Sequence, residues 1–139
     1  MVEYMFERGL NIHEIKALYG GAGWQAEADN AANLAEGLAN STVMTARDDG
    51  RLVGMVRGVS DMHTVLLLDQ LVVLPEYQED GVDAHLLEEM IDYFRQVENI
   101  VAVGHDAHLN RLLKEQGFHA GSADTPCLIR PKQLVETEF

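Results

Sequence analysis

The chain is 139 residues long, with 47% hydrophobic and 24% charged residues, which is the composition of a folded soluble protein rather than a disordered one. The length suits one domain over residues 1–139, and we expect a cytoplasmic protein because neither a membrane span nor a signal peptide is apparent. A net charge of −13 disfavours nucleic acid and anionic membrane surfaces as partners, and the lone Cys127 excludes an internal disulfide and a multi-cysteine zinc site.

The first forty residues predict a strand and two helices. Apolar residues at even spacing indicate the strand within residues 1–11. Asn11 can cap a helix that the glycine-rich stretch 20–23 ends, and Asp29 or Asn30 can cap a second helix.

Three strands are predicted next. Residues 43–47 and 52–57 are predicted as two strands. The Asp-Gly step within residues 48–50 predicts a hairpin between them. Residues 66–74 are almost continuously apolar, which indicates a strand buried on both faces.

The second half of the chain alternates helices and short strands. We predict a helix from Gly81 to about Gln96, a buried strand at 100–103, a helix at 107–116, and terminal strands at Phe118 and at Cys127-Leu128-Ile129. The step from strand 66–74 through a short polar turn into the helix at Gly81 is notable, because the free N–H groups of a helix start attract anions.

That turn carries a resemblance. The pattern Val73-x-Pro75-x-Tyr77-Gln78-x-x-Gly81 resembles the cofactor motif of the GNAT superfamily of N-acetyltransferases, and Gln116-Gly117-Phe118 matches a second family segment. The order of predicted elements agrees over nearly the whole chain. The resemblance implies an α/β (α+β) GNAT acyl-CoA N-acyltransferase fold, in which helices flank a central mixed, mostly antiparallel sheet.

The resemblance also implies acetyl-coenzyme A as co-substrate, with no metal. In this family the first two helices flank the acceptor site, so Tyr19 and Trp24 either line that site or pack in the core. The strand supplies backbone groups to the pantetheine arm, and the turn and helix start hold the diphosphate. The implied cofactor-binding residues are Leu71, Val72, Val73, Gln78, Glu79, Asp80, Gly81, Val82, Asp83 and Ala84.

Three of these positions are acidic where the family prefers small or basic residues. Glu79 and Asp80 lie inside the turn, and Asp83 replaces the last small residue. A carboxylate about 6 Å from a phosphate, at an effective dielectric of about 40, costs about 1.4 kcal/mol. Alternatively, these acids simply stabilise the helix start, by about 0.3–1 kcal/mol each.

The groups that would move protons differ from the family as well. Leu112-Leu113 stand where a Phe-Tyr pair is common, so the phenol that would protonate the thiolate is missing, and Asp106 replaces a common Asn. Asp69 is the candidate base, because it is a carboxylate inside an apolar strand; the alternative is that it pairs with a neighbouring Arg or with backbone. Asp61 and His63 are weaker candidates.

Two other signals point to no chemistry. His105-Asp106-Ala107-His108 lacks a third metal ligand, and Cys127 lacks an adjacent base and is expected in a buried strand.

Two hypotheses for function follow. The first is an N-acetyltransferase that transfers acetyl from acetyl-coenzyme A to the primary amine of a small-molecule or peptide acceptor. The second is a catalytically impaired GNAT-fold binding or regulatory module with weak or no cofactor binding. The chain's acidity would attract an amine, although solubility alone also explains it. A homodimer formed through an exposed sheet edge is compatible with either hypothesis.

Overall fold

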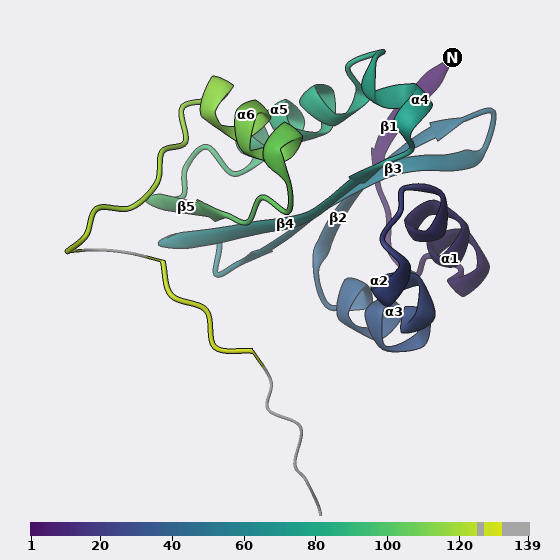
Figure 1. The fold of residues 1–139 in the computed structure, drawn as a ribbon, viewed down its shortest axis with the longest axis horizontal. Helices are drawn as coiled ribbons and strands as arrows, with labels where there is room; N and C mark the ends of the chain where they lie inside the picture. The colour runs from purple at the N-terminus through teal and green to yellow at the C-terminus, as the bar shows by residue number, and fades with distance from the viewer. Residues whose placement is uncertain (125–126, 132–139) are drawn as a thin grey trace, which may run out of the picture.

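The computed structural model describes residues 1–124 and 127–131, and its centre is a five-stranded sheet (Figure 1). The strands lie in chain order and are antiparallel, except that the last two are parallel. They are β1 (Val2–Phe6), β2 (Thr42–Asp48), β3 (Arg51–Ser60), β4 (Val65–Val73) and β5 (Asn99–Ala102). The predicted mixed, mostly antiparallel sheet is therefore confirmed.

Helices cover both faces of the sheet (Figure 1). One face carries α1 (Ile12–Gly21), α2 (Gln25–Asp29) and α3 (Ala31–Ala39); the other carries α5 (Val82–Tyr93) and α6 (Ala107–Glu115), and the short α4 (Pro75–Gln78) follows β4. The four long helices were predicted, and the side chain of Asn11 caps α1 by accepting from the His13 N–H at 2.7 Å. The sequence pattern gave no sign of α2 and α4, because four or five residues are too few to show a helical period. Within the part of the chain that the structure describes, no helix has the length and apolarity to cross a membrane.

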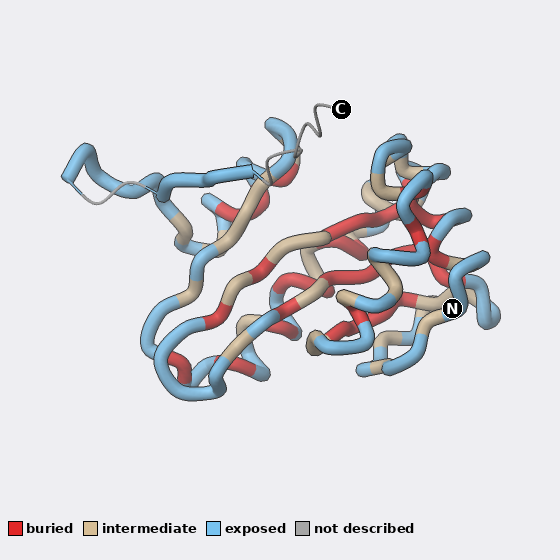
Figure 2. The backbone as a smooth tube through the Cα atoms, turned by 90° about the horizontal axis from the view of Figure 1, so that it is seen from below, coloured by how far each residue is buried: buried red, intermediate tan, exposed pale blue. Residues whose placement is uncertain are grey.

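The core lies against both faces of β3 and β4, whose tubes are mostly red in Figure 2. Its largest fully buried side chains come from α1, from α5 and its C-cap Phe94, and from these strands. A Cβ on Gly58 would lie 2.8 Å from the Cε of Met90, so a glycine in β3 lets α5 approach the sheet closely.

A bulge interrupts β4 in its second half. Two residues of β4, Gln70 and Leu71, lie opposite the single residue Val56 of β3, and Gln70 has a φ of 53°. Before the bulge, β5 pairs with β4, and the last pair is Leu68 with Ala102. A bulge bends its strand and increases the local twist, so the bulge accompanies the point where β4 leaves β5.

The predicted terminal strands are wrong. Residues 118–124 and 127–131 contain no strand, and Leu128 and Ile129 are 84% and 73% exposed. Cys127 is exposed rather than buried. Three apolar residues bury too little area to offset the entropy of ordering a strand.

Candidate active site

The candidate active site is the split between β4 and β5, beside the start of α5. After its last pairing with β5, at Leu68, β4 continues to Val73, and there its register partners lie on β3 alone. The side of β4 that faced β5 thus has no partner strand within residues 1–124 and 127–131. An unpartnered strand edge offers N–H and C=O groups to an extended ligand with amide groups.

The turn that follows β4 places the start of α5 beside the unpartnered edge of β4. Gly81 is the N-cap residue of α5 and adopts the left-handed conformation, with a φ of 75°. Because glycine has no side chain, the start of α5 has no side-chain capping hydrogen bond from this position. The side chain of Gln78 donates from Nε2 to the carbonyl of Val73 at 3.2 Å, which ties the turn to the end of β4. Gln78, Gly81 and Val73 therefore lie together, as the motif implies.

The three acidic residues of this turn are not equivalent in the structure. Glu79 and Asp80 are exposed, so water screens their charges. Asp83 is buried, with 3% of its surface exposed. The sequence pattern distinguished Asp83 as the residue that replaces a small one, but it carried no information on burial.

Asp83 lies between two helix starts. Its Oδ1 accepts from the backbone N–H of Ala84 at 2.8 Å, and its Oδ2 lies 2.6 Å from Nε2 of His108, in the first turn of α6. The His108 side chain is 42% exposed. The sequence offered no signal for this contact, since the two residues are 25 positions apart. One first-turn donor of α5 is thereby already used by the protein's own carboxylate.

Side chains of α6 close over the split itself. Between the strands there remains a cavity of about 10 Å³. Its lining includes Asp69 and Leu71 from β4, Val103 after β5, and Leu109 and Leu113 from α6. Leu113 is buried, and it stands where the family resemblance placed a phenol.

Asp69 pairs with Arg57, its register partner on β3. The Arg57 Nε and Nη2 donate to the two Asp69 oxygens at 2.7 and 2.6 Å, and both side chains are less than one-fifth exposed. The hydrogen bond to Asp69 raises the pKa of Arg57 above its usual value. Of the two alternatives open from sequence, pairing with an Arg is therefore what the structure shows, and the role of Asp69 as a base stays a prediction.

Two aromatic contacts lie near the bulge. The Tyr19 hydroxyl donates to Oε1 of Gln70 at 2.9 Å, and burial raises the pKa of this phenol, so it is a hydrogen-bond donor and not a base. The Trp24 ring lies 5.7 Å from that of Tyr19 and 4.5 Å from that of His105. Tyr19 is a core residue, whereas Trp24 is half-buried and joins the α1–α2 turn to the segment after β5.

Asp61, one of the weaker candidates for the base, has a structural role in its own turn. The carboxylate of Asp61 accepts hydrogen bonds from the Thr64 hydroxyl and from the backbone N–H groups of residues 63–65. These bonds lower the pKa of Asp61, so it shapes the turn instead of accepting protons. Within the described ranges, no cluster of His, Cys, Asp and Glu could hold a metal ion.

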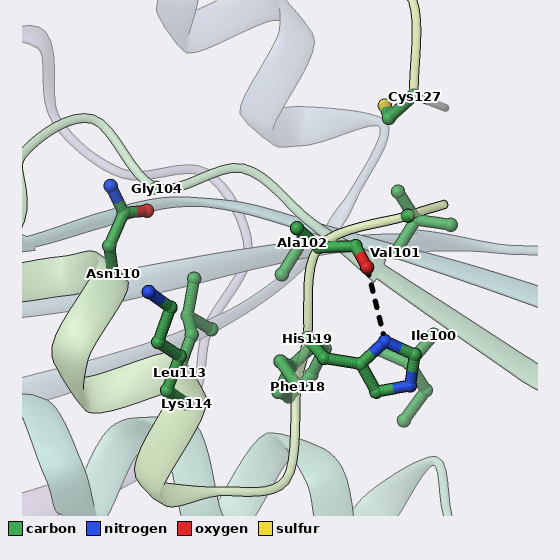
Figure 3. A pocket seen from close by; sticks show the side chains of 12 residues that line it. Ile100, Val101, Ala102, Gly104, Asn110, Leu113, Lys114, Phe118, His119 and Cys127 are labelled. Carbon is green, nitrogen blue, oxygen red and sulfur yellow. Dashed lines mark hydrogen bonds between the residues drawn. The ribbon is translucent and has the colours of Figure 1, made fainter. Parts of the chain in front are cut away.

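A larger groove of about 610 Å³ lies at the outer edge of β5 (Figure 3). Ile100, Val101 and Ala102 form its floor, and Leu113 and Phe118 form part of its wall. It is not the split, but Leu113 of α6 and Ala102 of β5 line both spaces.

Comparisons with known proteins agree with this geometry. The model of the acetyltransferase (GNAT) family matches residues 3–118. A GNAT-family acetyltransferase from Streptococcus pneumoniae superposes with a TM-score of 0.80 at 23% identity, covering 96% of this chain and 100% of that one. A Staphylococcus aureus protein described as a probable acetyltransferase also gives 0.80 at 23% identity, over 95% and 100%. A Brucella melitensis GNAT acetyltransferase in complex with acetyl-coenzyme A gives 0.62 at 20% identity, over 80% of each chain.

A search of curated proteins found no match. At these identities the solved structures show the fold alone, whereas the family model covers most of the chain. The chain belongs to the GNAT family of acetyltransferases.

Proposed function

We propose that this protein transfers an acetyl group from acetyl-coenzyme A to the primary amine of a small-molecule or peptide acceptor. The observation that carries the proposal is the split of β4 from β5 at a bulge, directly before the start of α5. This arrangement puts an unpartnered strand edge next to a helix start, which suits a ligand with an amide-bearing arm and an anionic end.

Each predicted cofactor residue has a role in this proposal. Backbone groups of Leu71, Val72 and Val73 would hold the pantetheine arm and polarise the thioester carbonyl. The segment Gln78–Ala84 would face the diphosphate with the free amides of the first turn of α5. The side chain of Gln78 already holds this segment against β4. Acetyl-coenzyme A itself supplies the activated acetyl group.

The reaction needs a route for one proton at the amine and one at the thiolate. The amine nitrogen bonds to the thioester carbon, the carbon–sulfur bond breaks, and the amine proton passes to Asp69 or to water. Because two hydrogen bonds from Arg57 fix the position of the Asp69 carboxylate, we expect Asp69 to attract and orient an ammonium group as well. Leu113 cannot protonate the sulfur, but a thiol with pKa near about 8.5 makes a thiolate that can leave without an acid.

The test combines binding with turnover. Calorimetric titration with acetyl-coenzyme A measures binding, and release of free thiol with a panel of primary amines measures transfer. We expect saturable binding and amine-dependent thiol release, with a lower kcat for D69N. Absence of binding at millimolar acetyl-coenzyme A, in the wild type and in a D83G variant that carries the small residue usual in the family, would overturn the proposal.

A second candidate function is a GNAT-fold module that has lost catalysis. Two observations favour it: Leu113 occupies the place of the phenol, and the buried Asp83 uses an amide of the anion site. On this reading, replacing Glu79, Asp80 and Asp83 together by glycine creates an affinity that the wild type lacks. Micromolar binding and turnover by the wild type would contradict it.

A further inference from the structure

We propose that Asp83 and His108 form a latch that closes the enzyme over its own cofactor site. In this closed state the Asp83 carboxylate takes the place of the cofactor diphosphate at the start of α5, and α6 covers the open side of β4. The inference rests on the proposed function, because it concerns how acetyl-coenzyme A reaches that same site.

The first step is that the anion site already holds an anion. The start of α5 has no side-chain cap at Gly81, yet Asp83, within the first turn, is buried and has partners for both oxygens. An incoming diphosphate must therefore displace the carboxylate from the Ala84 N–H or lie beside a buried negative charge. Both alternatives oppose binding.

The second step is that the pair joins two helices. The helices α5 and α6 lie on the same face of the sheet (Figure 1). His108 lies in the first turn of α6, whose N-cap Asp106 accepts from the Leu109 N–H at 2.9 Å, so the 2.6 Å contact between Asp83 and His108 joins the first turns of α5 and α6. Leu109 and Leu113 of the same helix line the cavity of about 10 Å³ in the split. That volume is about the size of one water molecule, so a thioester arm enters only when α6 moves away from β4.

Breaking one contact would therefore open both parts of the site. When the Asp83–His108 contact breaks, the Ala84 N–H is freed for the diphosphate and α6 is freed from α5. The half-exposed His108 side chain can then turn towards a phosphate, which attracts it when it is protonated. The apparent affinity for acetyl-coenzyme A is lowered by the fraction of molecules in which the latch is closed.

Neighbouring charges supply a matched control. On β1, burial and then the nearby Asp83 raise the pKa of Tyr4. The Tyr4 ring stacks on the His85 ring, with the ring centroids 3.8 Å apart. Glu89 and Asp92 lie on the same helix, α5, but they are exposed and are not among the predicted cofactor residues. The double variant E89Q/D92N thus removes more charge than D83N does, without touching the latch.

The binding experiment compares these variants by calorimetric titration with acetyl-coenzyme A. We expect D83N to bind about tenfold tighter than wild type or more, because it removes a buried charge and weakens the latch. We expect E89Q/D92N to change the affinity by less than about threefold, because water screens both side chains. An equal or larger gain for E89Q/D92N would overturn the latch in favour of general charge repulsion.

Hydrogen exchange of the cofactor-free protein tests the latch without ligand, after circular dichroism confirms folding. D83N and H108Q should each speed exchange of the Leu112 and Leu113 amides on α6 by about tenfold, and leave the central β3 amides unchanged. Unchanged α6 exchange would overturn the latch, whatever the binding result. If α6 responds but no variant binds acetyl-coenzyme A at millimolar concentration, the latch stands and the proposed function fails.

Discussion

Two carboxylates beside the split each have a close side-chain partner, but these partners lie in different surroundings. Asp69 and Arg57 are both in the sheet, with side chains 14% and 19% exposed. The Asp83 side chain is more deeply buried, at 4%, but the side chain of its partner His108 is 42% exposed. Both members of the pair in the sheet are thus mostly shielded from water, whereas water can reach and replace the His108 side chain in the pair between the helices. The first pair therefore maintains the sheet at the bulge, and the second can open.

The largest effect that separates the two regions is expected from R57M. This change leaves the Asp69 carboxylate buried without a cation, which costs about 3–5 kcal/mol in the free energy of unfolding. Urea denaturation at pH 7, followed by circular dichroism, measures it. The double variant R57M/D69L should recover most of the loss, because an apolar pair of similar volume is often as stable as a buried ion pair. A loss below about 1 kcal/mol for R57M would mean that water already reaches Asp69.

An intermediate effect is expected from R47Q, at the other end of the sheet. Arg47 donates to Glu7 at 2.8 Å and to Glu14 at 2.8 Å, and these partners are 21% and 35% exposed. Burial would raise the pKa of Glu7, but hydrogen bonds from Arg47 and Thr45 outweigh it and lower the value; hydrogen bonds from Arg47 also lower the pKa of Glu14. We expect a loss of about 1–2 kcal/mol at neutral pH, discounted for the exposure of Glu14.

The sign of the pH dependence follows from those lowered values. A carboxylate whose pKa is lower in the folded than in the unfolded state stabilises the fold above its ordinary pKa, 4.5 here, and loses that contribution as pH falls through the folded value. The difference in stability between wild type and R47Q should therefore shrink below about pH 4.5. Acid titrations of both proteins measure it, and a difference that grew on acidification would contradict the assignment.

The fold could be predicted from sequence because its signals are local. The Asp-Gly turn after β2, the apolar run of β4 and the glycine before α5 each depend on a few adjacent residues. The terminal strands were predicted from a short apolar run alone, and such a run does not supply the partner edge that a strand requires.

The candidate site was predictable only as a segment. The motif placed the cofactor beside β4 and α5, but the bulge depends on a positive φ at Gln70, a residue type that gives no local warning. The contact partners of the two carboxylates lie 12 positions apart for Arg57–Asp69 and 25 for Asp83–His108, so they became visible only when the sheet and helices brought them together.

A smaller effect than those of R57M and R47Q is expected from H108Q, and it is the sharpest test of the comparison. Without the His108 ring, water can reach Asp83 and hydrogen-bond to its carboxylate. The glutamine side chain also still offers an N–H donor. We therefore expect a loss of only about 1 kcal/mol, after discounting for the exposure of His108. The exposed pair Asp92–Arg95, 3.9 Å apart, sets the lower bound: R95Q should cost less than about 0.5 kcal/mol. If H108Q in urea denaturation cost as much as R57M, the helix pair would be as closed to water as the sheet pair, and α6 could not open without unfolding.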